Sequence, residues 1–258
     1  MKFKFTVLGC GSSLGIPRID GYFGQCNPKN KKNYRTRCSA LISIDDFNIL
    51  IDTSPDLKNQ LLISKIKNIN KVFYTHHHAD QTHGINELRV FYLKNRKKIP
   101  VYADNSTKKF LLNSFKYCFK NNADDYPPIL KLNNLKLKHT FTYKNNKIIL
   151  KSVTVRHGSI NSVAYIINNK CAYIPDANEI YNKDINLFRN LNFLVIDCLR
   201  YKYHPSHFTL NEILELIKEI KPKKTILTNL NNEIDYSSIQ KLLPNNVIPA
   251  FDGMSFYI

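Results

Sequence analysis

Residues 71–84, KVFYTHHHADQTHG, carry four histidines and an aspartate directly after an apolar stretch. Neutral imidazole nitrogens and carboxylate oxygens are the usual protein ligands of zinc and manganese. His76 and His78 stand one residue apart in a turn after a predicted strand, so both rings can converge on one ion, and Asp80 can face a neighbouring position. A histidine run can also be an incidental feature of a polar surface. Its place between an apolar strand and a glycine that precedes a helix favours a metal site.

The elements that must position this segment alternate between strands and helices. Apolar alternation and β-branched residues predict strands over residues 3–8, 40–44, 48–51, 71–74, 101–103, 148–155, 162–167, 172–174, 193–196 and 225–227. Helical spacing predicts helices over residues 55–65, 85–93, 106–119, 210–220 and 237–243. This alternation is typical of a layered α/β domain.

The predicted helix over residues 210–220 has a signal at its start. Thr209 and Glu212 match the S/T-x-x-E capping box, which satisfies two backbone N–H groups, and the helix is predicted to end before Pro222. Residues 121–134 (NNADDYPPILKLNN) are polar and contain proline, so they are predicted to form a mobile loop. With no repeat and no low-complexity linker, residues 1–258 are expected to form a single domain.

The composition is typical of a globular protein. With 258 residues and 43% hydrophobic content, the chain can bury a full core. No apolar run approaches the roughly 18 residues needed to span a bilayer, and the first residues are too weakly apolar for a signal peptide. We therefore expect a cytoplasmic protein with no membrane partner. The six cysteines lie far apart without a C-x-x-C pair, so we expect neither disulfides nor a zinc ribbon.

The formal charge of +18 suggests an affinity for nucleic acid, because clustered lysines and arginines release counterions from a phosphate backbone. The basic residues nevertheless occur in short scattered runs, at residues 29–37, 94–98 and 221–224. Lysine, asparagine and isoleucine are abundant along the whole chain, which is a general bias of composition. A nucleic-acid partner is therefore compatible with the sequence but is not favoured.

Several further motifs accompany the histidine segment. The chain opens with TVLGCGSSLGIP, continues through RTRCSALI and ILIDTSPDL, and follows THHHADQTHGINELR with IPVYA. These motifs, together with the H-x-H-x-D signature of His76, His78 and Asp80, resemble the metallo-β-lactamase superfamily over nearly the whole chain. They are most similar to its PhnP-like branch, which includes a phosphoribosyl cyclic phosphodiesterase. The resemblance implies an α/β fold of four αββα layers, with two mixed β-sheets packed face to face and helices outside.

The resemblance also implies further metal ligands. His157 in VRHGS matches a third histidine ligand, and Asp176 in AYIPDAN matches a carboxylate that bridges two metal ions. The first metal site then consists of His76, His78, His157 and Asp176. The second site retains Asp80 and Asp176. We expect a divalent cofactor, zinc or manganese, at one or two ions per chain.

Two positions depart from the family pattern. Gln81 stands where the family has the second histidine of D-H, and Asn229 stands where its last histidine ligand is found. Amide oxygens suit hard ions such as manganese or magnesium better than zinc, so the second site should bind weakly or with a different preference. His83 is an alternative ligand, or a residue that hydrogen-bonds to one. Some relatives also hold a structural zinc near the start, but the corresponding segment here retains only Cys26, so we expect no such site.

The resemblance implies hydrolysis by a metal-activated water, which Asp80 would orient. The leaving oxygen then needs a proton, and the HPSHFTL turn offers His207 as the general acid and His204 as the reserve. His207 can equally pack against the start of the following helix.

Three functions remain open from the sequence. The leading one is a phosphodiesterase that acts on a small, cyclic or linear, phosphodiester. The second is a nuclease related to the tRNA 3′-end endonuclease, although no long arm rich in glycine and basic residues is inserted in this chain. The third is an impaired metal-binding member of the fold. Dimerisation is common in the fold, so a homodimer is compatible with each of them.

Overall fold

The computed structural model describes residues 3–121 and 127–258. Two seven-stranded sheets dominate the described residues. The first contains, in spatial order, β14 (Ser255–Tyr257), β1 (Lys4–Gly9), β2 (Ser39–Ile44), β3 (Phe47–Ile51), β4 (Lys71–Phe73), β5 (Ile99–Ala103) and β6 (Leu130–Asn134). The second contains β13 (Val247–Pro249), β12 (Lys224–Thr228), β11 (Phe193–Asp197), β10 (Cys171–Ile174), β9 (Ile160–Ile167), β8 (Asn146–His157) and β7 (Lys138–Tyr143).

Both sheets are mixed. Antiparallel pairs join β1 to β2 and β2 to β3, whereas β3 to β6 run parallel to one another. Likewise, antiparallel pairs join β7 to β10, whereas β10 to β13 are parallel. The parallel strands need crossover segments, and these supply the helices and the loops of the site. The expected αββα architecture is therefore confirmed.

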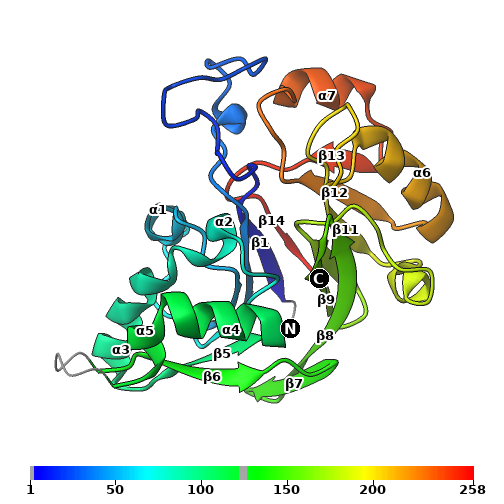
Figure 1. Cartoon of the computed structure of the whole chain (residues 1–258). Helices are drawn as coiled ribbons and strands as arrows, with labels where there is room; N and C mark the ends of the chain where they lie inside the picture. Colours follow the sequence, from blue (N-terminus) through cyan, green and yellow to red (C-terminus); the bar gives the residue numbers. More distant parts are fainter. Residues whose placement is uncertain (1–2, 122–126) are drawn as a thin grey trace.

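The helices lie on the outer faces of the two sheets (Figure 1). Those beside the first sheet are α1 (Leu57–Ile63), α2 (Ala79–Thr82), α3 (Arg89–Asn95), α4 (Asn105–Ser114) and α5 (Lys116–Phe119). Those beside the second sheet are α6 (Leu210–Ile220) and α7 (Tyr236–Leu242). Short 3₁₀ turns complete the described elements, at η1 (Lys31–Asn33), η2 (Ile85–Leu88) and η3 (Ile185–Phe188).

Three apolar cores hold these layers together. The core between the sheets contains side chains from both, including Phe73 of β4, Tyr173 of β10 and Val195 of β11. A second core packs helices against the first sheet, and a third packs α6 and α7 against the second sheet through residues such as Ile213 and Ile239. Burial of these apolar faces is the main source of stability for such layers.

The capping box predicted for α6 is confirmed. The Thr209 side chain accepts from the backbone N–H of Glu212, and the Glu212 carboxylate accepts from the backbone N–H of Thr209. The helix ends at Ile220, and its C-cap Lys221 adopts a left-handed conformation directly before Pro222. This cap fixes the start of α6, and with it the preceding turn that carries His204 and His207.

The prediction of a loop over residues 121–134 is wrong at its C-terminal end. Residues 130–134 form β6, which pairs in parallel with β5. The apolar side of this strand packs on the core through Leu130, which outweighs the polar character of its neighbours. Residues 122–126 of this predicted loop lie outside the described residues.

The segment over residues 10–37, here called the arm, lies over one end of the two sheets (Figure 1, blue). The buried Arg35 anchors it, because its guanidinium donates to the backbone carbonyls of Ile234 at 2.8 Å and Asn231 at 3.3 Å. Gly24 has a φ of +60°, and a Cβ there would lie 2.4 Å from the carbonyl oxygen of Asn232. Glycine therefore permits the arm to pack tightly on the loop that follows β12.

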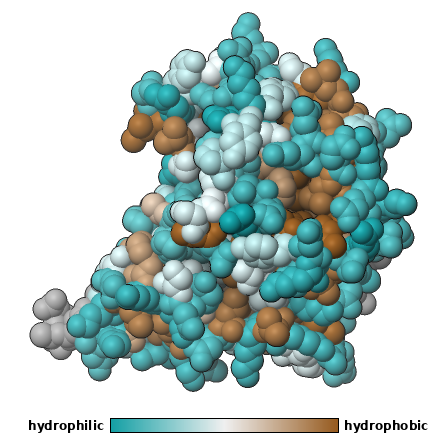
Figure 2. Space-filling model, turned by 45° about the vertical axis from the view of Figure 1, so that its right-hand side comes forward, coloured by the Kyte–Doolittle hydropathy of each residue, from teal (hydrophilic) through white to brown (hydrophobic). Residues whose placement is uncertain are grey.

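The surface in Figure 2 is mainly hydrophilic, with separate apolar patches. None of the helices in the described ranges is long and apolar enough to cross a membrane. All six cysteines are buried free thiols. Cys26 is part of the arm, and its thiol donates to the carbonyl oxygen of Ile234 at 3.3 Å.

Candidate metal centre

Three imidazoles converge at one end of the sheets. His76 and His78 follow β4, whereas His157 ends β8 of the other sheet. His76 Nε2 lies 2.9 Å from His78 Nδ1, and His157 Nε2 lies 3.3 Å from the same atom. The structure thus brings together three histidines that the sequence predicted as ligands, from two sheets.

Hydrogen bonds on the far side of two rings determine where their protons lie. The Thr75 hydroxyl donates to Asp52 Oδ2 at 2.9 Å, so it accepts from His76 Nδ1 at 3.0 Å. His157 Nδ1 donates to the backbone carbonyl of Ser206 at 2.7 Å. Both Nε2 atoms therefore present lone pairs towards His78, as metal-ligating histidines do when an outer partner fixes their tautomer.

A close approach of two loops makes the second of these bonds possible. Gly158 has a φ of +61°, and a Cβ there would lie 2.8 Å from the Cβ of Ser206. Any larger residue would push the two loops apart and lengthen the bond from His157 Nδ1 to the Ser206 carbonyl.

The three rings are held in their neutral form. Burial lowers the pKa of His76 well below its ordinary value, and the neighbouring His157 and His78 lower it further. Burial and the charge of His207 lower the pKa of His157 to about 4. Burial also lowers the pKa of His78. Neutral imidazoles bind a metal without first releasing a proton, so this donor set fits a divalent ion.

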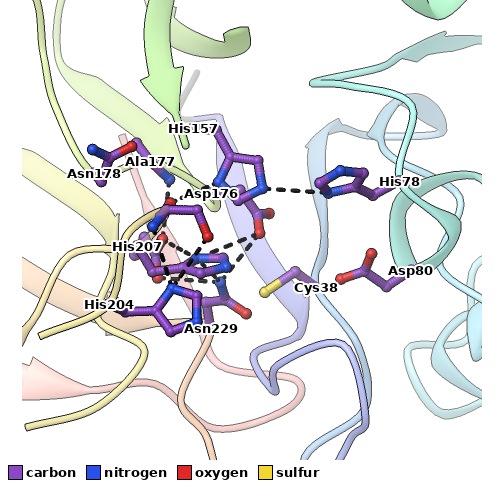
Figure 3. A network of polar contacts seen from close by, with 12 residues as sticks. Cys38, His78, Asp80, His157, Asp176, Ala177, Asn178, His204, His207 and Asn229 are labelled. Carbon is purple, nitrogen blue, oxygen red and sulfur yellow. Dashed lines mark hydrogen bonds and ion pairs between the residues drawn. The ribbon is translucent and has the colours of Figure 1, made fainter. Parts of the chain in front are cut away.

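Asp176 adds a carboxylate beside the histidines. It follows β10 and is buried, and it forms a group of close ligand atoms with His157 and His207. Burial raises the pKa of Asp176 well above its ordinary value, and the nearby charge of Asp80 raises it further. Figure 3 shows His78 and Asp80 facing His157 and Asp176 from opposite sides of the site. Two facing carboxylates in a buried site favour the presence of a cation.

Gln81 and Asn229, the two amide residues that differ from the family pattern, lie beside this carboxylate. Gln81 Nε2 donates to Asp176 Oδ2 at 3.0 Å, and Asn229 Nδ2 donates to Asp176 Oδ1 at 3.2 Å. His83 does not join them. Its exposed ring lies 3.1 Å from the Thr82 hydroxyl and packs edge-on against Phe115, so in this arrangement it is not among the converging ligand atoms of the described residues.

His207 lies at the inner edge of the same site. Its Nδ1 donates to Asp197 Oδ2 at 2.6 Å, and Asp197 is fully buried at the end of β11. Burial lowers the pKa of His207, but the charge of Asp197 and the hydrogen bond to it outweigh this effect and raise the pKa to about 9. His204 differs, because burial and the charge of His207 lower its pKa. A protonated His207 is thus available near neutral pH.

A cavity of about 390 Å³ opens onto these residues. It is lined on the metal side by His78, Asp80, His157, Asp176, His207 and Asn229, and towards the mouth by Ser12, Ser13, Leu14, Gly15, Arg18, Leu199, His204, Ser206, Asn231 and Asn232. Within the described ranges, Arg18 is the only lysine or arginine in this lining. Its guanidinium pairs with Asp20 and stacks over Tyr22, with 5.2 Å to the ring centroid.

Sequence reasoning missed Asp52, Asp197 and Arg18. Asp197 ends an apolar strand, FLVID, as Asp52 ends ILID, and this strand-end pattern is the same signal that identified His76. Arg18 carries no local signal, because only the folded arm brings it to the cavity.

Comparisons with known proteins place this site in a family. The model of the β-lactamase superfamily domain matches residues 47–228, which is more than half of the chain. The crystal structure of a new diphosphatase from the PhnP family is similar to this chain, with 28% identity, a TM-score of 0.90, and coverage of 100% of this chain and 98% of the other. Human tRNase Z, short form, shares the fold at 17% identity and a TM-score of 0.69, with 98% of each chain covered.

A curated relative has a different name. The octanoyltransferase of Porphyromonas gingivalis is 28% identical over 258 residues, which cover 99% of this chain and 51% of the relative. The chain thus spans about half the length of that protein. The family model, the two sheets and the converging histidines agree with one another. The chain therefore belongs to the β-lactamase superfamily, and its structure is similar to that of a PhnP-family diphosphatase.

Proposed function

We propose that this chain is a phosphodiesterase that cleaves a P–O bond in a small phosphodiester or diphosphate ester. The observation that carries the proposal is a common cavity, which is lined by His78 and His157 of the three-histidine group and by His207, the partner of Asp197. The similarity to a PhnP-family diphosphatase supports the same class of substrate. His76, His78, His157 and Asp176 are the proposed ligands of the ion.

The side chains have distinct roles in this proposal. A divalent ion held by these ligands would supply Lewis acidity and lower the pKa of the attacking water. Asp80 lines the cavity and accepts a hydrogen bond from that water, which orients it towards phosphorus. His207 uses Nδ1 to bind Asp197, which leaves Nε2 to donate a proton to the leaving oxygen. His204 hydrogen-bonds to the Ser206 hydroxyl at 3.1 Å, so we assign the general acid to His207.

Arg18 is expected to bind the anionic part of the substrate that remains outside the metal site. For Arg18→Ala we expect KM for a diphosphate ester to rise roughly tenfold with little change in kcat, because a charge-assisted hydrogen bond contributes about 1.5–3 kcal/mol. Steady-state kinetics measure this effect. Lys29→Ala is a matched control, because Lys29 is exposed on the same arm and does not line the cavity. Equal kinetics for both variants would contradict the role of Arg18.

The proposed activity can be tested with three substrates. Purified protein loaded with Mn²⁺ or Zn²⁺ is assayed on bis(p-nitrophenyl) phosphate, on a nucleoside diphosphate ester and on precursor tRNA. Hydrolysis of the small esters alone, lost after chelation, supports the proposal. Cleavage of precursor tRNA at its 3′ end would instead assign a nuclease. A protein that binds metal but hydrolyses none of them would be an impaired member of the family.

A further inference from the structure

We propose that this chain holds a single divalent ion, and that Gln81 and Asn229 form an amide clamp on Asp176 in place of a second ion. The inference concerns the site of the proposed function and rests on that function. The three-histidine group is complete without either amide, because its nitrogens come from His76, His78 and His157. At the second metal position, the two amides stand where the family pattern has histidines.

Gln81 supplies one half of the clamp. Its Nε2 donates to Asp176 Oδ2 at 3.0 Å and lies 3.4 Å from Asp80 Oδ2. The side chain is fully buried in α2, and the Gln81 backbone carbonyl accepts from Thr53 N at 2.8 Å, which fixes its position. An ionised carboxylate oxygen only accepts hydrogen bonds, so the NH₂ end of the amide must face the two aspartates.

Asn229 supplies the other half. Its Nδ2 donates to Asp176 Oδ1 at 3.2 Å and to Asp197 Oδ1 at 3.1 Å. Two carboxylates on one side again determine which end of the amide faces them. The residue is buried and has a φ of +59°, a conformation that asparagine and histidine both tolerate better than most side chains. The backbone conformation would therefore permit a histidine at this position, so the change from histidine to asparagine alters only the side-chain chemistry of the site.

Together the two amides engage both oxygens of Asp176. An amide nitrogen shares its lone pair with the carbonyl group and is no metal ligand, and an amide oxygen can coordinate only if the group turns over. Turning either amide would break its bonds to the carboxylates and place oxygen against oxygen. The clamp thus gives Asp176 neutral N–H partners where a bridging carboxylate would meet a second cation.

The side-chain oxygen of Gln81 would favour the opposite outcome, a second bound ion. Gln81 Oε1 is buried and has no hydrogen-bond partner within the described ranges. An unpartnered buried acceptor costs about 1–3 kcal/mol, so it would gain from a cation if the amide turned over. The number of bound ions separates the two arrangements directly.

The test is the metal content per chain, which does not depend on activity. The wild-type protein is dialysed against Zn²⁺, and separately against Mn²⁺, then desalted and analysed by mass spectrometry. We expect one ion per chain with either metal. For the double variant Gln81→His/Asn229→His we expect two ions, because imidazoles replace the clamp. The control Asn59→His/Asn113→His adds two histidines at exposed positions and should retain one.

Two ions in the wild-type protein would overturn the clamp and leave the proposed function intact, whereas no ion at all would overturn the proposed function. A double variant that still holds one ion would show that the amides do not prevent a second ion from binding. If that variant does not fold, paramagnetic resonance of the Mn²⁺-loaded wild-type protein decides, because the clamp predicts an isolated ion and a coupled pair of ions would overturn it.

Discussion

The variant His78→Ala is expected to lose the bound ion and to lower kcat/KM for a small phosphodiester by about 10³-fold. It removes one of three converging imidazoles, and Lewis-acid stabilisation of several kcal/mol corresponds to a rate factor of this size. His78 is exposed, so the cores should tolerate alanine at this position. Metal content and kinetics are both measured, together with the melting temperature.

His83→Ala is the matched control for this variant. His83 is exposed in the same segment but lies against the ring of Phe115 and outside the cavity lining. It should keep the ion and nearly the full rate. A His78→Ala protein with unchanged metal content and unchanged rate would show that the three-histidine group is not the metal site.

The second large effect is expected at His207. His207→Gln should lower the rate by about 10²–10⁴-fold for an ester with a poor leaving group, because the leaving oxygen no longer receives a proton. For a p-nitrophenyl ester the loss should be much smaller, since p-nitrophenolate leaves without protonation. This difference between substrates separates a chemical role from a role in packing. Equal losses on both esters would contradict the general-acid assignment.

The same residue predicts a pH dependence. The pKa of His207 is raised to about 9, so the wild-type rate should hold through neutral pH and fall as the pH rises through about 9, where the ring loses its proton. Asp197→Asn removes the negative charge that raises this pKa. The alkaline fall should therefore move to lower pH in that variant. His204→Ala, which changes the neighbouring half-buried ring, should leave the fall close to its wild-type position.

The sequence predicted the parts of the fold that have strong local signals. The long apolar strands and the capping box of α6 were identified because each depends on residues close in sequence. β6 and β7 were missed because polar residues outnumber apolar ones in both, and β13 and β14 because each is only three residues long. Tertiary packing, which short windows do not contain, decides such segments.

For the site, too, local signals could be read from the sequence and long-range contacts could not. Residues directly after a predicted strand, such as His76 and His78, could be selected from the sequence because strand ends gather at one edge of a sheet. The resemblance to the superfamily then suggested His157, Asp176 and His207. The bonds of Asn229 to two aspartates could not be foreseen, because its partners lie 53 and 32 residues away in the chain.

The proposed ligands come from two separate sheets, and this has a consequence for unfolding. His78 and His157 are 79 residues apart, so an ion that binds both closes a long loop across the seam between the layers. Loading the protein should therefore slow amide hydrogen exchange in the turn after β4 and in the end of β8 together, although neither segment pairs with the other. Chelation should speed exchange at both, while the interior of each sheet keeps its protection. The ion would then be a crosslink between two sheets that otherwise meet through the apolar core between them.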